Sequence, residues 1–227
     1  MQIAEIFYSI QGEGGLIGVP SVFVRTSGCN LRCTWCDTPY TSWQPEGETL
    51  PVERVVEQVM SYGATHVVIT GGEPMIASEI GELTARLRFE RMHITIETAG
   101  TVYAPVACDL MSISPKLANS TPSEDRAGAW SQRHEERRIQ HTALRRLIAE
   151  YEHQLKFVVS APEDLAEIQE ILKWTGASPD RTILMPEGVE REELRARGLW
   201  LAEICKRGGF RFSPRLHVEL WGNRRGT

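Results

Sequence analysis

The sequence contains no uninterrupted hydrophobic run of about 18 residues, the length that marks a transmembrane helix. Residues 1–5 also lack the basic start and the apolar stretch of a secretory signal. Acidic residues outnumber basic ones, 30 to 25, and the net charge of −5 argues against broad, charge-driven binding to nucleic acids. We therefore expect a cytoplasmic protein that binds neither membranes nor nucleic acids directly.

The carboxyl-terminal segment departs from this acidic balance. Residues 205–227 hold six basic side chains and a single acid, Glu219. A basic segment suits an anionic small substrate or RNA, but a solvated surface is the simpler interpretation. We expect the segment to lie on the surface.

Cysteine is scarce, and its distribution is uneven. Three of the five cysteines, Cys29, Cys33 and Cys36, lie within eight residues. An extracellular disulfide framework does not cluster its cysteines so tightly, whereas a metal site in a reducing compartment does. Cys108 and Cys205 stand alone at a predicted strand edge and inside a predicted helix, where a small buried thiol is expected.

Apolar, strand-like runs alternate with amphipathic, helix-like stretches along most of the chain. This alternation predicts βαβ units and a mostly parallel sheet, and about six such repeats favour a partial or modified (β/α) barrel. We expect a single domain over residues 1–227, with a charged insertion around 118–153 that serves as an elaborated crossover, a dimer contact or a lid. The insertion is predicted to contain a polar loop (119–125) and a helix (137–151). The predicted strands are 3–8, 22–26, 66–70, 93–97, 110–114, 155–159 and 182–185, and the other predicted helices are 51–62, 76–88, 162–174 and 191–206.

The cysteine spacing is C-x3-C-x2-C, directly after a predicted strand. Thiolates are soft ligands for iron–sulfur clusters, zinc or copper(I). A structural zinc site needs four ligands, so it would require a distant fourth residue such as His66. Three thiolates on a four-iron cluster instead leave one iron open to a small chelating molecule. The end of a strand is also where barrel enzymes build their sites.

Polar groups follow three further predicted strands. Gly71-Gly72-Glu73-Pro74 combines glycines that permit close backbone approach, a carboxylate that can accept a hydrogen bond from an ammonium group, and a proline suited to a first helical turn. Glu97 and the tripeptide Ser114-Pro115-Lys116 also come after apolar runs. Plain turns and solvated strand ends explain these features equally well when each is taken alone.

The C-x3-C-x2-C spacing resembles the motif of the radical S-adenosylmethionine superfamily. The resemblance implies that Cys29, Cys33 and Cys36 hold a [4Fe–4S] cluster whose open iron binds S-adenosylmethionine. Reduction by an external donor, such as a flavodoxin or ferredoxin, then yields methionine and a 5′-deoxyadenosyl radical. The implied cofactor contacts are Trp35, Cys36, Asp37, Gly72, Glu73, Glu97, Ser114, Pro115 and Lys116, with later contacts from residues 154–156 and 185–187.

A last motif, residues 9–14 (Ser-Ile-Gln-Gly-Glu-Gly), follows the first predicted strand. It lacks the lysine and glycine spacing of a phosphate-binding loop. A Gln and a Glu on a tight glycine turn could recognise a flat ring with donors and acceptors, or could simply form a turn. Together with Phe23-Val24-Arg25-Thr26, Cys36-Asp37-Thr38 and residues 215–223, the motif closely resembles the 7-carboxy-7-deazaguanine synthase family.

That second resemblance implies a specific reaction. The substrate would be 6-carboxy-5,6,7,8-tetrahydropterin, converted to 7-carboxy-7-deazaguanine with loss of ammonia, on the route to queuosine and other 7-deazapurines. It also implies a homodimer and a Mg²⁺ ion held by Thr38. Asp37 is expected to be a positioning group, and His217 a surface histidine. The implied substrate contacts are Ile10, Gln11, Gly12, Arg25 and Thr70. A glycyl-radical-enzyme activase and a non-enzymatic zinc-binding module remain the alternatives.

Overall fold

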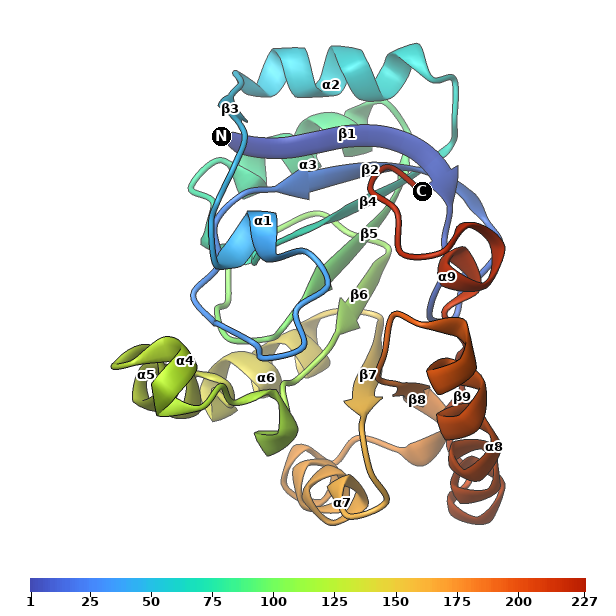
Figure 1. Cartoon of the computed structure of the whole chain (residues 1–227). Helices are drawn as coiled ribbons and strands as arrows, with labels where there is room; N and C mark the ends of the chain where they lie inside the picture. Colours follow the sequence, from blue (N-terminus) through green and yellow to red (C-terminus); the bar gives the residue numbers. More distant parts are fainter.

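The computed structural model describes residues 1–227 and contains one curved sheet of nine strands (Figure 1). The strands are β1 (Gln2–Ile10), β2 (Pro20–Thr26), β3 (Glu48–Thr49), β4 (His66–Gly71), β5 (His93–Thr98), β6 (Leu110–Ile113), β7 (His153–Val159), β8 (Thr182–Pro186) and β9 (Arg211–Phe212). Their order is β3-β1-β2-β4-β5-β6-β7-β8-β9. From β2 to β9 every neighbouring pair is parallel, whereas β1 runs antiparallel to β2 and to β3. The two edges, β3 and β9, do not pair, so the predicted partial barrel is confirmed.

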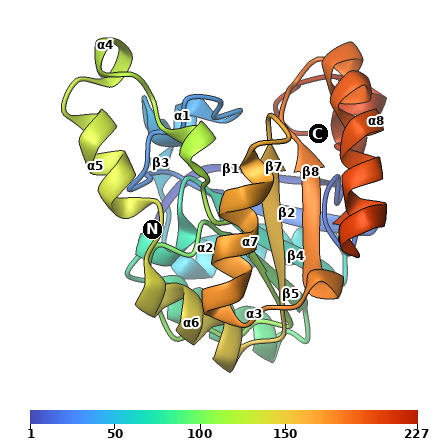
Figure 2. The ribbon, with the colours of Figure 1, turned by 90° about the horizontal axis from the view of Figure 1, so that it is seen from below.

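Most of the longer helices cover the outer side of the sheet, whereas α1 (Pro39–Ser42) and α9 (Leu216–Trp221) contribute residues to a cavity on its inner side. The other helices are α2 (Val52–Ser61), α3 (Ile80–Phe89), α4 (Glu124–Ala127), α5 (Trp130–Arg137), α6 (His141–Glu150), α7 (Asp164–Thr175) and α8 (Arg191–Gly208), with 3₁₀ turns η1 (Pro74–Ile76), η2 (Ala118–Ser120) and η3 (Pro179–Arg181). Figure 2 shows α7 and α8 lying against β7 and β8, with α6 beside α7. The amphipathic stretch predicted over 51–62 forms α2, in which Val52, Val55 and Val59 are buried and Val56 is partly buried against the core. No helix has both the length and the apolar character needed to cross a bilayer.

One continuous apolar core lies between the sheet and these helices, and it joins residues from Met1 to Cys205. The strands contribute nearly unbroken apolar runs, as expected for a parallel sheet that is covered by helices. In β4, for example, Val67, Val68 and Ile69 are all at most 1% exposed. The interior strands were therefore recognisable in the sequence as short apolar runs.

Two predicted helices differ from those observed. The helix expected from residue 76 begins only at Ile80, because η1 ends in an extended residue, Ala77 (φ −73°, ψ 124°). The insertion also holds more helix than expected. The polar loop predicted over 119–125 contains η2 and the start of α4, and the helix predicted over 137–151 is interrupted at the extended residue Gln140 (φ −117°, ψ 93°).

Candidate active site

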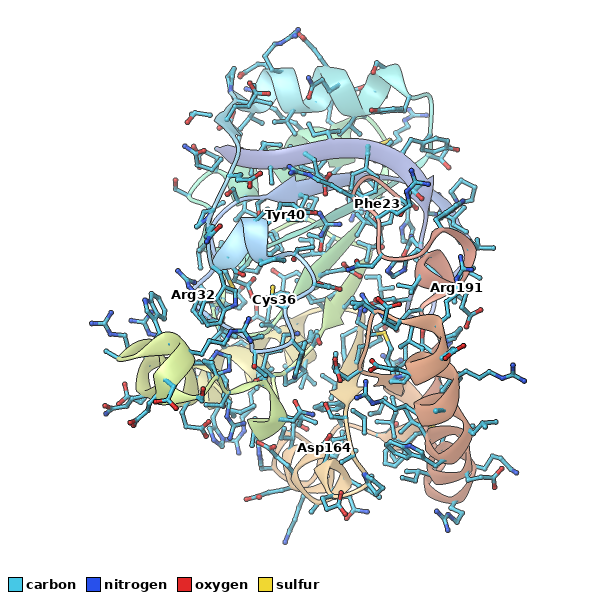
Figure 3. All side chains as sticks on the ribbon, viewed as in Figure 1. Phe23, Arg32, Cys36, Tyr40, Asp164 and Arg191 are labelled. Carbon is cyan, nitrogen blue, oxygen red and sulfur yellow. The ribbon has the colours of Figure 1, made fainter.

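A cavity of about 500 Å³ lies inside the curved sheet, at the carboxyl ends of the parallel strands. This volume falls within the range of small-molecule sites. The residues around it come from the loop after β1, the cysteine loop, the ends of β2 and β4 to β8, and the carboxyl-terminal tail. Figure 3 shows Cys36 near the centre of the molecule, beside α1. The structure thus brings together motifs that span the whole chain.

All three clustered cysteines line this cavity and carry free thiols. Burial raises the pKa of Cys29 and of Cys33 to about 12, so both thiols hold their protons at neutral pH until a metal displaces them. The Cys36 Sγ lies 3.2 Å from the Ser42 Oγ. Leu31 and Ala99 pack beside the three cysteines and shield them from water.

The arrangement fits a cluster with an open iron better than a closed zinc site. No three His, Cys, Asp or Glu side chains come together in a geometry suited to a single ion. His66, the fourth zinc ligand considered from the sequence, begins β4 and so lies at the opposite end of that strand from the cysteine loop. Its ring packs against His93, with centroids 4.7 Å apart. His66 is therefore excluded as the fourth ligand of a zinc site.

Glu73 lies behind the cavity wall rather than in it. Its side chain is 1% exposed, and its carboxylate accepts hydrogen bonds from the Thr98 hydroxyl (2.7 Å), the Ala99 amide (2.8 Å) and the Met75 amide (3.1 Å). Burial raises its pKa. The predicted contact of this side chain with a cofactor is therefore not supported by the geometry, and the carboxylate instead ties the loop after β4 to the end of β5. Pro115 is buried too and does not line the cavity.

Gly72, next to Glu73, is required by close packing of the backbone. A Cβ atom on Gly72 would lie 2.0 Å from the Gly28 carbonyl oxygen and 2.7 Å from that of Thr41. Only glycine allows the loop after β4 to approach the cysteine loop this closely. The sequence suggested that these glycines permit close backbone approach. In the structure, Gly72 makes that approach to the cysteine loop.

Seven of the other predicted cofactor contacts line the cavity, namely Trp35, Cys36, Asp37, Gly72, Glu97, Ser114 and Lys116. Of the later contacts, Lys156 and residues 185–187 line it, whereas Gln154 and Leu155 do not. Lys116 donates from Nζ to the Ser114 Oγ (2.8 Å) and lies 5.7 Å from the centroid of the Trp35 ring. Glu97 accepts a hydrogen bond from the Thr70 hydroxyl at 2.8 Å. These strand ends present both cationic and anionic groups to one space.

The five predicted substrate contacts, Ile10, Gln11, Gly12, Arg25 and Thr70, also line the cavity. Gln11 is buried and donates from its amide nitrogen to the Ser21 hydroxyl (3.0 Å). Arg25 donates from Nε to Glu5 (2.7 Å), and its two Nη groups make no hydrogen bond. The Nε of the Arg25 guanidinium is therefore held by Glu5, while its two Nη groups remain available to bind a ligand.

A buried ionic network that sequence reasoning missed crosses the floor of the cavity. Glu13 pairs with the Lys156 Nζ (2.5 Å) and the Arg215 Nε (2.9 Å), and Arg215 also pairs with Asp37. Burial alone would raise the pKa of Glu13, but the two cations hold it well below its usual range. Glu13, one of the two residues considered for recognition of a flat ring, is therefore already paired with two cations. No local motif marks this network, because its members come from four distant segments.

The basic carboxyl-terminal segment is largely exposed, as expected, but Arg215 is an exception and the end of the segment borders the cavity. Arg215 is only 6% exposed, and residues 223–227 line the cavity. His217, expected on the surface, also lines it and packs so closely on Gly12 that a Cβ there would lie 1.9 Å from its Nδ1. Arg215 turns inward, where the buried Glu13 and the more exposed Asp37 offer it two carboxylates.

The insertion packs directly against the cysteine loop. The Arg32 amide donates to the His134 Nδ1 (3.0 Å), the Thr34 amide donates to the Ser120 carbonyl (2.8 Å), and the Trp35 indole donates to the Asn119 carbonyl (3.1 Å). His134 is fully buried, and burial lowers its pKa to about 4, so the ring is neutral at ordinary pH. The insertion forms the elaborated crossover from β6 to β7, one of the roles suggested from the sequence, and it also braces the cysteine loop.

Comparisons with known proteins agree with this geometry. The Radical SAM superfamily model matches residues 23–118. The 7-carboxy-7-deazaguanine synthase of Halobacterium salinarum is 46% identical, with 98% of this chain aligned to 91% of the relative. That of Rhodopirellula baltica is also 46% identical, over 99% of this chain and 88% of the relative.

Solved structures give the same result at the level of the fold. The crystal structure of QueE from Escherichia coli is similar with a TM-score of 0.71 and 27% identity, over 95% of this chain and 94% of that one. Streptococcus suis SuiB bound to S-adenosylmethionine shares the fold alone, with a TM-score of 0.54 and 13% identity over 82% of this chain and 48% of that one.

Proposed function

Because the chain belongs to the 7-carboxy-7-deazaguanine synthase family of radical S-adenosylmethionine enzymes, we propose that it converts 6-carboxy-5,6,7,8-tetrahydropterin to 7-carboxy-7-deazaguanine. The reaction releases ammonia and serves the formation of queuosine and other 7-deazapurines. A [4Fe–4S] cluster and S-adenosylmethionine are the cofactors of the superfamily. The whole chain acts as a single domain in this proposal.

The cluster is held by Cys29, Cys33 and Cys36, the three thiols that face the cavity. The bound cofactors supply an electron and the adenosyl radical that takes a hydrogen atom from the substrate. Trp35, Glu97, Ser114 and Lys116 line the same space and orient S-adenosylmethionine. The apolar packing around the thiols keeps water away from this chemistry.

The substrate lies against the wall formed by β1 and β2. The unpaired Nη groups of Arg25 present a planar cationic fork suited to a carboxylate. The Gln11 side-chain nitrogen is engaged by Ser21, so its oxygen remains free to accept a hydrogen bond from a ring N–H. Thr70 lies on the adjacent strand β4, and its backbone pairs in register with that of Arg25.

A magnesium ion beside the substrate carboxylate completes the proposed site. Thr38 lines the cavity, and its hydroxyl oxygen is the kind of hard ligand that Mg²⁺ prefers, with waters filling the other positions. We further propose a cytoplasmic homodimer that receives its electron from a flavodoxin or a ferredoxin.

One observation supports the proposal above all others: the cysteine thiols and the Arg25–Gln11 wall face one cavity. The test is to incubate the reconstituted, reduced protein anaerobically with S-adenosylmethionine and the carboxypterin, and to identify the product by mass spectrometry. The deazapurine is expected, together with iron and sulfide in the protein. Cofactor cleavage without any deazapurine would reject the substrate, and bound zinc without sulfide would reject the radical chemistry.

A further inference from the structure

We propose that Glu5 is a positioning residue that ties the C-terminal strap (residues 223–227) to Arg25, so that the strap closes the cavity on the side where the substrate carboxylate binds. This inference rests on the proposed function only in making Arg25 the carboxylate ligand. The tie itself is formed by hydrogen bonds and ion pairs within the chain.

The carboxylate of Glu5 joins three walls of the cavity. It lies on β1 with its side chain 13% exposed. Its Oε1 accepts hydrogen bonds from the Arg25 Nε on β2 (2.7 Å) and from the Tyr40 hydroxyl on α1 (2.8 Å). Its Oε2 accepts one from the Arg225 Nε in the strap (3.2 Å). No other carboxylate of the chain accepts hydrogen bonds from the side chains of three different residues.

Arg225 provides the main attachment of the strap to the rest of the molecule. Besides Glu5, it contacts Glu46 (3.1 Å) and the Ala4 carbonyl (3.1 Å), and its guanidinium lies 4.2 Å from the centroid of the Tyr40 ring. The strap follows α9 and has no regular structure of its own. Figure 1 shows it running from α9 to the carboxyl terminus in front of the sheet, near β2.

The contacts of Arg225 hold the strap weakly, which suits a segment that opens to exchange substrate. The Arg225 side chain is 46% exposed, and ion pairs at such a position each stabilise a structure only slightly. Several weak contacts can order the strap over a bound substrate and still release it for exchange. Tyr40 remains a donor throughout, because burial and the hydrogen bond to Glu5 raise its pKa to about 12.

The shared carboxylate links the strap to the orientation of Arg25. Glu5 accepts from Arg25 with one carboxylate oxygen and from Arg225 with the other. The Nη groups of Arg25 stay free, and its guanidinium lies 5.6 Å from the centroid of the Phe7 ring. Without Arg225, both oxygens of Glu5 become available to Arg25 and would draw its Nη groups away from the cavity. Loss of Glu5 would release both arginines.

The test measures steady-state kinetics for the carboxypterin with R225Q, R225K, E5Q and the R225Q/E5Q double variant. R207Q is the matched control, because Arg207 is an exposed α8 arginine without an ion pair. We expect R225Q and E5Q each to raise KM about tenfold with kcat nearly unchanged, the pattern of lost substrate binding. R225K should recover part of the loss, and the double variant should be no worse than about the poorer single one.

Hydrogen exchange of residues 222–227 gives a second, substrate-independent measurement. The strap amides should exchange faster in R225Q and E5Q than in R207Q. A KM for R225Q within twofold of the R207Q value, or additive effects in the double variant, would overturn the inference. Failure of the proposed function would be seen separately, as a wild-type protein that makes no deazapurine from the carboxypterin.

Discussion

At the scale of single residues, Arg215 is the clearest case of a charge that the fold cannot easily lose. Its side chain is 7% exposed and stands between Glu13 and Asp37. Taking a guanidinium out of water is costly, and the cost is offset only while both carboxylates and the Gly188 carbonyl receive its N–H groups. The residue therefore supports the wall of the cavity that it lines.

Replacing Arg215 with Met should reduce the free energy of unfolding by about 3–5 kcal/mol, because two carboxylates would lose their buried partner. Urea denaturation measures this, with R207M as an exposed control. The pKa values of Glu13 and Asp37 are both lowered in the folded protein. The stability that they add is therefore present at neutral pH and is lost as the pH falls below their usual values. R215M should show a smaller acid-side loss, because Glu13 keeps only Lys156 as a partner, and an unchanged pH profile would contradict the assignment.

Cys33 is proposed to bind the cluster, whereas Cys205 is not, so the two cysteines can be compared directly. Cys33 lines the cavity, whereas Cys205 is buried in α8, where its Sγ approaches only the Arg211 carbonyl (3.8 Å). Cys33→Ala should abolish iron binding and cleavage of S-adenosylmethionine, and Cys205→Ala should leave both nearly intact. Iron analysis and release of 5′-deoxyadenosine measure the two effects. Residual cleavage in Cys33→Ala above about 1% of wild type would count against the cluster assignment.

At the scale of elements, the limit of sequence reasoning follows from the range of the contacts. The buried strands were predictable because runs such as Val67–Ile69 carry their signal in adjacent residues. The cysteine loop was predictable for the same reason. The pairing of Glu13 with Arg215 was not, because 202 residues separate the partners and each alone is an ordinary charged residue. The bracing role of the insertion was also missed, since His134 binds a backbone amide 102 residues away.

The brace made by the insertion predicts a graded effect of changes at His134. His134→Leu removes the acceptor of the Arg32 amide, which should cost about 1–3 kcal/mol of stability and loosen the cysteine loop. His134→Asn places an oxygen near the position of Nδ1 and should recover much of the loss. The measurements are iron content after reconstitution and the electron paramagnetic resonance spectrum of the reduced protein. Equal behaviour of the Leu and Asn variants would argue that this hydrogen bond does not hold the loop.

At the scale of the whole molecule, the open sheet is bridged by the loop after β1. The Gly14 amide donates to the Ser213 hydroxyl and the Gly15 amide to the Gln154 side-chain oxygen, both at 2.9 Å. These bonds join the β1 side of the sheet to β7 and to the segment after β9, although β3 and β9 do not pair. A Cβ on Gly14 would lie 2.5 Å from the Gln154 amide nitrogen, so the glycines are needed for this closure. The cavity is thereby enclosed by segments from both halves of the chain.

A ligand that fills such a cavity should link both halves and stabilise the whole fold. S-adenosylmethionine at about 100 times its dissociation constant should add about 2.7 kcal/mol, which for a chain of this size corresponds to a rise in Tm of roughly 5–11 °C. Anaerobic calorimetry of the iron-loaded protein measures the shift. The same concentration should leave the Tm of Cys33→Ala nearly unchanged, because S-adenosylmethionine would lack the iron on which it anchors. An equal rise in both proteins would show that the cofactor binds without the cluster, and would remove the cysteine loop from the centre of the site.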